Sequence, residues 1–334
     1  MNYSEGFSAS YYACIVDPIT WRDGERIEIT GGSINRSGTG LRDSADIDTA
    51  RYRLEREQYI RIYLDARQGG SSSHEPLFTG LACSPESDID GVLEANALQC
   101  YSVLKAADDM LLPIGYFAPQ GVEGTRIIQD LLSVIPAPVT AENGSPSLRS
   151  HIVAEDGETR LTMADRVLDA IGWRMTIRGN GEINLSPYST SEDAVFDPQY
   201  NDVLEPSIKV EYDWYEAPNV YRAILDDVAA VARDDSPDSS LSTINRGREI
   251  WAEDTSADLN TGESIAEFAE RKLRELQQVA FTAEYSRRYD PNVYVGCVVR
   301  LNYPQQRLNG LFRVTSQKIE LGHGARTSEE VKGI

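Results

Sequence analysis

Residues 162–187 read TMADRVLDAIGWRMTIRGNGEINLSP, and this stretch decides how the middle of the chain folds. Its first part carries apolar residues at helical spacing, and Gly172 can end that helix because glycine readily adopts a positive φ. The Gly-Asn-Gly run that follows predicts a tight turn between two strands, since Asn-Gly tolerates positive φ at both central positions. The prediction is therefore an α+β unit with a helix near 162–172 and a hairpin at 173–186.

The residues before and after this stretch extend the same unit. Apolar residues recur at helical spacing near 125–135, where a proline ends the predicted helix. Thr162 and Asp165 have the spacing of a capping box, which predicts the start of the second helix. An acidic, irregular segment closes the unit at its C-terminal side, so residues 105–205 are expected to form an α+β middle domain.

The first hundred residues predict β-structure. From Tyr59 to Asp65 the aliphatic side chains alternate with Tyr, Arg and Asp, which is typical of a half-buried strand. Several such runs, separated by turns rich in Gly and Asp, favour an antiparallel barrel or sandwich. Residues 1–104 are therefore expected to form a first barrel-like tube domain.

The last third of the chain returns to strand patterns. Residues 206–334 predict a second barrel-like tube domain, interrupted by an acidic loop at 228–263 and an amphipathic helix at 264–279. The final strand changes its alternation, which predicts a bulge or bend near Ser316. The predicted fold class is α+β but mainly β, with two antiparallel barrel-like tube domains and an α+β insertion between them.

The charge of the chain excludes several kinds of partner. The sequence has 53 acidic and 32 basic residues, for a formal charge of −21, so sequence-specific nucleic-acid binding and anionic membrane surfaces are disfavoured. The N-terminus lacks the pattern of a signal peptide. Residues 110–122 are the most apolar stretch, but two prolines interrupt it and it is shorter than a span. We therefore expect a soluble protein without a membrane anchor, made in a cytoplasm.

Motifs that carry chemistry are missing from the sequence. The four cysteines are isolated, which predicts reduced thiols and neither disulfides nor a zinc site. The histidines, His74, His151 and His323, lie in loop-like sequence, and the common hydrolase and phosphate-loop motifs are absent. We therefore expect no catalytic residue, no cofactor, no metal site and no enzymatic activity.

Two aspartate-rich runs, at 43–48 and 88–91, have the composition of calcium loops. An EF-hand loop ends in a glutamate, but Gln99 stands at the twelfth position counted from Asp88. Solvated turns are the favoured interpretation, because aspartate is common in turns. A pair of carboxylates acting in glycoside hydrolysis stays open, since so many acids are present.

Six residues are candidates for an assembly interface: Tyr212, Trp214, Tyr215, Arg246, Arg248 and Trp251. The three that come first form a dense aromatic cluster, which fits core packing and a buried interface about equally well. The two arginines and the tryptophan after them form a small cationic island in an acidic region. The island is either a solvated loop or a contact with an acidic neighbour.

The order of segments resembles a known family. After the helix and hairpin, Ala217-Pro-Asn-Val-Tyr221 opens the second β region, and Ser236-Pro-Asp-Ser-Ser240 precedes Arg246-Gly-Arg248. A second helix then leads to Asp290-Pro-Asn-Val-Tyr294 and to a final strand that starts Asn309-Gly-Leu-Phe. In order and spacing these segments resemble the hub protein of contractile phage-tail baseplates, the type found in defective prophage particles and related to the hub of T-even phages.

The resemblance implies a structural role. It implies a homotrimer whose paired tube domains form a pseudo-hexameric ring, joining a six-fold tail tube to a three-fold central spike. The implied partners are the tail tube protein, the central spike protein and the surrounding baseplate wedge proteins. The implied location is the tail baseplate of a virion, assembled in the host cytoplasm. A cell-wall hydrolase of a tail, and another tail-tip ring or an adhesin, remain the alternatives.

Overall fold

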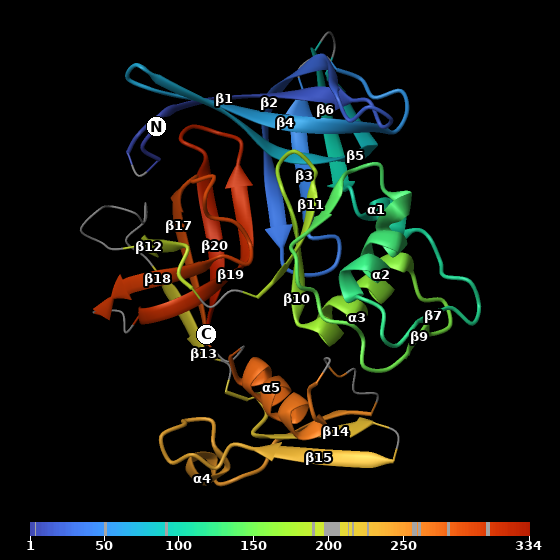
Figure 1. Ribbon diagram of the computed structural model, residues 1–334. Helices are drawn as coiled ribbons and strands as arrows, with labels where there is room; N and C mark the ends of the chain where they lie inside the picture. Colours follow the sequence, from blue (N-terminus) through green and yellow to red (C-terminus); the bar gives the residue numbers. More distant parts are fainter. Residues whose placement is uncertain are drawn as a thin grey trace.

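The computed structural model covers the whole chain in four connected units (Figure 1). The residues that it describes are 1–3, 5–49, 52–90, 93–188, 191–196, 208–212, 214–215, 217–225, 227–255, 259, 262–278, 281–304 and 308–334. Strands dominate these residues, so the predicted class, α+β and mainly β, is confirmed.

The first β unit is a closed ring of antiparallel strands. Its strands are β1 (Ser8–Val16), β2 (Asp23–Ser37), β3 (Asp43–Thr49), β4 (Gln58–Gln68), β5 (Ser71–Asp90) and β6 (Leu93–Ser102). They pair in the order β1-β4-β5-β6-β3-β2, and the ring closes because β1 also pairs with the first half of β2, with Ala13 opposite Ile27. Fully buried aliphatic side chains such as Ile60 and Ile62 fill its interior.

The second β unit forms a similar row of six strands. They are β12 (Ala194–Phe196), β13 (Lys209–Tyr212), β17 (Phe281–Arg288), β18 (Val298–Tyr303), β19 (Leu308–Glu320) and β20 (Arg326–Gly333). They pair in the order β12-β18-β19-β20-β17-β13, all antiparallel except β12 with β18. Val299, Leu301 and Val331 belong to its core.

The two β units join edge to edge through β2 and β19. Asn35 lies opposite Lys318 in this antiparallel pairing, which fuses both units into one twelve-stranded sheet. β19 has a register shift between Val314 and Ser316, so the bulge predicted near Ser316 is confirmed. The bulge bends β19, so that its first half pairs with β18 and its last residues pair with β2.

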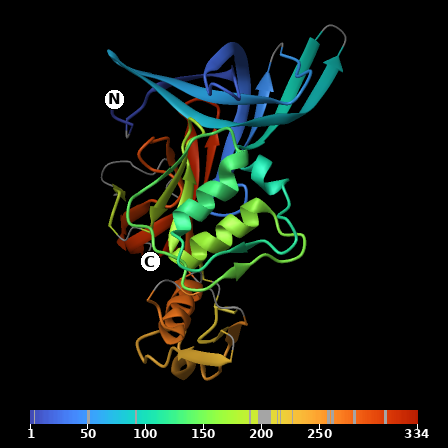
Figure 2. The same ribbon diagram turned by 45° about the vertical axis from the view of Figure 1, so that its right-hand side comes forward.

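The middle unit lies between the β units in sequence and contains the two longer helices packed together in Figure 2. Its elements are α1 (Lys105–Asp108), β7 (Phe117–Ala118), α2 (Gly124–Leu131), η1 (Leu132–Val134), β8 (Val139–Ala141), β9 (Ile152–Val153), α3 (Arg160–Ile171), β10 (Trp173–Ile177) and β11 (Ile183–Pro187). The helix predicted from Thr162 begins earlier. Thr159 is its cap, because its hydroxyl accepts from the Thr162 amide at 3.1 Å, and Gly172 ends it with φ 65°.

The turn of the β10–β11 hairpin docks onto the first β unit. The Gly179 carbonyl accepts a hydrogen bond from Thr79 Oγ1 at 2.8 Å, and the Asn180 carbonyl accepts from Trp21 Nε1 and Arg61 Nη2, each at 3.1 Å. A Cβ atom on Gly179 would lie 1.7 Å from the carbonyl oxygen of Pro76. Glycine is therefore required here for a close approach of two backbones.

A small α/β unit is inserted between β13 and β17, which pair with each other so that Tyr212 lies opposite Phe281. Its elements are β14 (Val220–Leu225), β15 (Val228–Arg233), α4 (Thr243–Arg246), β16 (Trp251–Asp254) and α5 (Ile265–Gln278). The prediction of a loop at 228–263 is thus wrong for much of its length. The pairing of β15 and β16 with β14, under the buried Phe268 of α5, outweighs the polar composition of this stretch.

Among the described residues, no helix is both long and apolar enough to cross a membrane.

Candidate functional site

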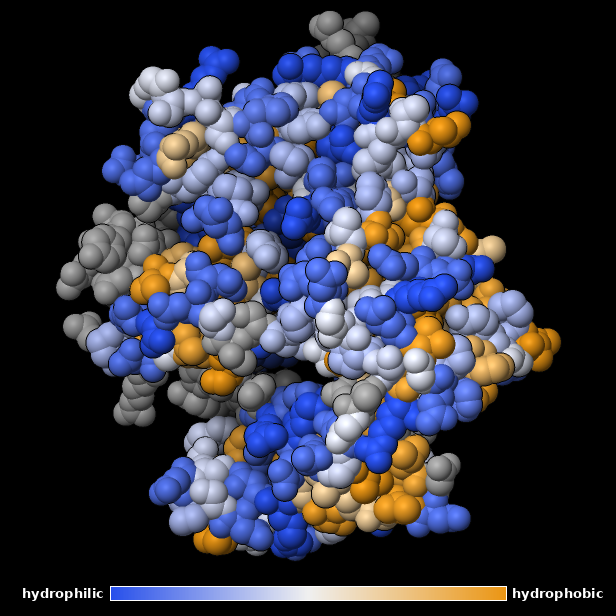
Figure 3. Space-filling view, in the orientation of Figure 1, coloured by the Kyte–Doolittle hydropathy of each residue, from blue (hydrophilic) through white to orange (hydrophobic). Residues whose placement is uncertain are grey.

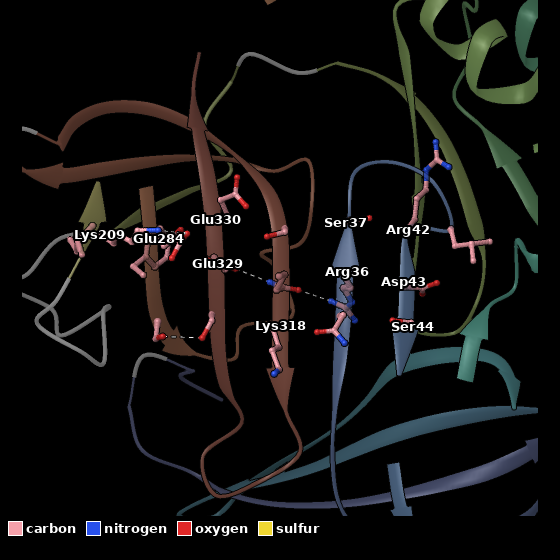
Figure 4. Close-up of a pocket in the computed structure, with 18 of the residues that line it drawn as sticks. Arg36, Ser37, Arg42, Asp43, Ser44, Lys209, Glu284, Lys318, Glu329 and Glu330 are labelled. Carbon is pink, nitrogen blue, oxygen red and sulfur yellow. Dashed lines mark hydrogen bonds and ion pairs between the residues drawn. The ribbon is translucent and has the colours of Figure 1, made fainter. Parts of the chain in front are cut away.

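A groove of about 1030 Å³ crosses the junction of the two β units (Figure 4). We call it the junction groove. Its lining residues come mainly from β2, β3, β17, β19 and β20, with Lys209 of β13 at one end and Tyr101 of β6 at the other. The groove therefore depends on the edge-to-edge pairing of β2 with β19, and neither β unit contains it alone.

The strand register places one polar row across the groove. Its members are Tyr101, Ser44, Asn35, Lys318, Ser328 and Ser286, on the strands β6, β3, β2, β19, β20 and β17 in that order. The next side chain along each strand points to the opposite face, where Ala45 and Ile319 are fully buried. One face of the continuous sheet is thus polar across both units, and we call it the polar face.

Acidic and basic side chains are nearly balanced on the polar face. By register it carries Asp46, Asp48, Glu211, Glu284, Glu320 and Glu330, together with Lys209, Lys318, Lys332, Arg288 and Arg326. Lys209 lies 3.1 Å from Glu211 and 3.2 Å from Glu284, and these two carboxylates raise the pKa of its ammonium group. A surface of this kind offers no excess of cations to hold a phosphate backbone.

A buried polar network lies on the opposite face, beneath the junction. Glu329 of β20 binds Arg287 of β17 through contacts of 2.5 and 2.9 Å, and both side chains are almost completely buried. Gln317 of β19 donates to Glu329 at 2.7 Å and accepts from Arg36 of β2 at 2.9 Å. Burial is the largest single effect and would lower the pKa of Arg287, but the charge and hydrogen bonds of Glu329, together with smaller effects of Tyr285 and Asp290, raise this pKa. The network ties the two units together.

Asp43 is a buried carboxyl group at the first-unit end of the groove. Burial raises its pKa to about 7, against smaller opposing effects from Ser102, Arg36 and Arg42. In the structure its Oδ1 atom has no hydrogen-bond partner. A neutral carboxylic acid suits this environment better than a carboxylate, because an unpaired buried charge is costly.

The protonation of Asp43 predicts a specific pH dependence. Its folded-state pKa lies above the unfolded value, so unfolding releases a proton between about pH 4 and 7, and stability falls as pH rises through that range. Between about pH 4 and 7 this effect lowers the free energy of unfolding by up to ~4 kcal/mol in total, and we expect Asp43→Asn to abolish this part of the pH dependence. Urea unfolding at pH 4.5 to 8 measures it. Equal slopes in the variant and the native chain would contradict the assignment.

Four of the six interface candidates meet at one place in the small unit, outside the junction groove. The guanidinium of Arg246 donates to the carbonyls of Trp214 and Ala217 and so holds the turn that carries the exposed Trp214 and Tyr215. Arg248 lies over the Tyr215 ring, 5.7 Å from its centroid. These side chains are not core residues, and their role in assembly stays a prediction.

The other two candidates lie on strands β13 and β16. The backbone of Tyr212 pairs with Phe281 in β13, whereas its side chain is outside the described residues. Trp251 is half exposed on β16, and its Nε1 donates to Glu249 at 2.9 Å.

The histidines have structural neighbours. His74 Nδ1 lies 2.6 Å from Asp65 Oδ1, and its ring stacks on Tyr63 with centroids 4.5 Å apart. His151 Nδ1 accepts from the Gln120 amide at 3.1 Å. Within the described ranges, no cluster of His, Cys, Asp and Glu side chains has the arrangement of a metal site.

Sequence reasoning missed the polar face, although a pattern was available. The run Asp43–Thr49 was interpreted as a turn, but it forms β3, with Ala45 and Ile47 buried inside the barrel and Asp46 and Asp48 exposed. This strict alternation is typical of a strand with one buried face and one solvent-exposed face. The turn interpretation is therefore wrong, because aspartate at every second position marks a solvated face as well as a turn.

No family model matches the sequence, and no curated protein is similar to it. Solved structures do match. A tail protein from Neisseria meningitidis MC58 is 15% identical, with a TM-score of 0.72 over 98% of this chain and 97% of that one. The 43 kDa tail protein of prophage MuSo2 from Shewanella oneidensis is 13% identical, with a TM-score of 0.70 over 97% and 98%.

The chain has the fold of these tail proteins. A prophage tail protein from Listeria monocytogenes EGD-e matches as well, at 12% identity and a TM-score of 0.59 over 97% of this chain and 94% of that one. The matches span almost the full length of each chain, so they include both β units, the middle unit and the small unit. The resemblance drawn from the order of segments is thereby confirmed for the fold.

Proposed function

We propose that the chain is the structural hub of a contractile-tail baseplate and performs no reaction. Three copies would form a ring that joins a six-fold tail tube to a three-fold central spike, inside the surrounding wedge proteins. The observation that carries the proposal is the edge-to-edge fusion of two β units into one sheet with a continuous polar face. Two such units in each of three copies give six positions around a ring.

The central strands of the two units, β2 and β19, have similar pairings. β2 pairs along its second half with β3 and along its first half with β1, and β19 pairs in the same way with β20 and β18. Each of the two strands has a register shift near its middle, after Ile29 in β2 and after Val314 in β19. This likeness relates the units by a two-fold axis, because β2 and β19 run in opposite directions. The six-fold repeat would instead relate β5, β6, β3 and β2 to β19, β20, β17 and β13, two consecutive sets of four strands with matching directions.

The ends of the sheet supply a way to close the ring. β4 pairs with β5 as far as Ala82, but β5 continues to Asp90, and the pairings of β13 lie on its β17 side. Within the described residues these two edges are open, and open edges pair readily with another chain. Three copies, each contributing β5, β6, β3, β2, β19, β20, β17 and β13, would make a ring of about 24 strands, roughly 50 Å across at usual spacing and tilt.

The polar face would line the channel of such a ring. Carboxylates there are at least as numerous as cations, so passing DNA would not be held by its phosphates. The proposed location is the tail baseplate of a virion, after assembly in the host cytoplasm. This role needs neither a cofactor nor a metal.

Native mass measurement and electron microscopy of the purified chain test the proposal. We expect a particle of three copies with a central channel, which binds the tube and spike proteins of the same tail. A monomer that binds neither protein would contradict the hub role. A ring of six copies would favour a different tail-tip ring, and clearing of purified peptidoglycan would favour the hydrolase alternative.

A further inference from the structure

Five large apolar side chains are exposed together at the outer end of the middle unit. They are Met110, Leu111, Ile114, Phe117 and Val153, and we call them the apolar tip. Ile114 is fully exposed, and Leu111 and Val153 are 62% and 60% exposed. Figure 3 shows apolar surface at this margin of the molecule, beyond β7 and β9 and away from the junction groove. Contiguous exposed apolar surface usually marks a contact site.

Backbone hydrogen bonds hold the apolar tip in place. The amide of Leu112 donates to Glu158 and the amide of Arg160 donates to Met110, each at 2.9 Å. Farther along, Ala154 donates to the Tyr116 carbonyl at 3.0 Å, and Phe117 lies opposite Val153 between β7 and β9. The exposed side chains therefore project from a bonded scaffold, and a partner would find them already arranged.

The charges beside the apolar tip indicate what it can bind. Glu155 and Asp156 are exposed there, and so is Asp109, whose carboxylate pairs with the ammonium group of Lys105. The nearby arginines point inward: Arg166 donates to the carbonyl of Val153 and to Glu158, both at 3.1 Å, and Arg160 donates to backbone carbonyls of the α2 end. The rim is therefore acidic, which disfavours an anionic lipid surface and favours a basic partner.

We propose that the apolar tip is a docking site for another protein of the same tail, which presents an apolar side-chain cluster flanked by Lys or Arg. The inference rests on the proposed hub function and adds to it the surface that attaches the hub to its surroundings. Apolar side chains would fill the centre of the contact, and the acidic rim would orient the basic flanks. The sheet that forms the ring takes no part in this contact.

A photo-crosslinker placed at the tip tests the proposal in assembled particles. The chain carrying Ile114→p-benzoylphenylalanine is produced by the strain that encodes it, the particles are purified and irradiated, and the crosslinked peptide is sequenced. We expect a crosslink to an apolar segment flanked by Lys or Arg in another tail protein. A crosslink to a second copy of this chain, to lipid or to nothing would overturn the proposal.

Substitutions give a second, quantitative measurement. We expect Ile114→Asp to lower incorporation into particles about tenfold while native mass shows the trimer intact, because central apolar anchors dominate interfaces. The double change Glu155→Lys and Asp156→Lys should give a smaller loss. Ile19→Asp is the matched control, since Ile19 is 93% exposed but lies between β1 and β2. Normal incorporation of Ile114→Asp would overturn the proposal, whereas loss of the trimer in the native chain would count against the hub function itself.

Discussion

Glu329→Gln should destabilise the chain by about 3–5 kcal/mol, because it leaves the buried Arg287 without its counter-ion. Arg287 is 2% exposed and Glu329 is fully buried, so water cannot replace the lost carboxylate. The loss is large beside the 5–15 kcal/mol that typically stabilises a folded protein. Urea unfolding at neutral pH measures the change, and the midpoint should fall without a change in slope.

The neighbouring Glu330 provides a matched control for this prediction. It lies one residue along β20, points to the polar face and is only half buried, so Glu330→Gln should change stability by less than about 1 kcal/mol. Replacing both partners by leucine should recover part of the loss, since a buried ion pair can be exchanged for apolar packing at little cost. Equal effects of Glu329→Gln and Glu330→Gln would refute the importance of the network.

Gly179→Ala should separate the hairpin turn from the first β unit and cost about 3 kcal/mol. The added Cβ would meet the carbonyl of Pro76 at 1.7 Å, and this atom belongs to a backbone that is itself fixed in a strand. Relief therefore requires the hairpin to move, which breaks the hydrogen bonds to Thr79, Trp21 and Arg61. Thermal unfolding measures the loss of stability, and the quenching of Trp21 fluorescence reports the movement of the hairpin turn.

Gly70→Ala is the control for the glycine prediction. Gly70 lies in the β4–β5 turn, where an added Cβ meets nothing within 4 Å and φ is not positive. We expect a change within about 0.5 kcal/mol. If Gly179→Ala were as mild as Gly70→Ala, the hairpin turn would not be clamped as the contacts indicate.

The sequence predicted local structure well where a pattern and a turn residue agreed. The helix ending at Gly172, the Gly-Asn-Gly hairpin and the bulge near Ser316 are all present. The predicted helix at 264–279 is present too, and it begins with a capping box in which the Glu267 amide donates to Ser264 Oγ at 3.2 Å. These features are set by residues close together in the chain, so spacing alone defines them.

Features that depend on distant residues could not be read in this way. The junction groove exists because Asn35 pairs with Lys318. These residues are far apart in the chain, so no short sequence pattern predicts their pairing. The hairpin turn gave no hint that Gly179 also contacts Thr79. Within the small unit, the loop prediction for 228–263 misses β15, because this stretch with its run of alanines becomes a strand through pairing with β14.

The way the small unit is inserted has a practical consequence. It leaves the sheet after β13 and returns at β17, and these strands lie side by side with Tyr212 opposite Phe281. A short turn could therefore span the same two strand ends without disturbing the register around them. The scaffold can therefore exchange this module for another, and a foreign domain could be grafted at the same point.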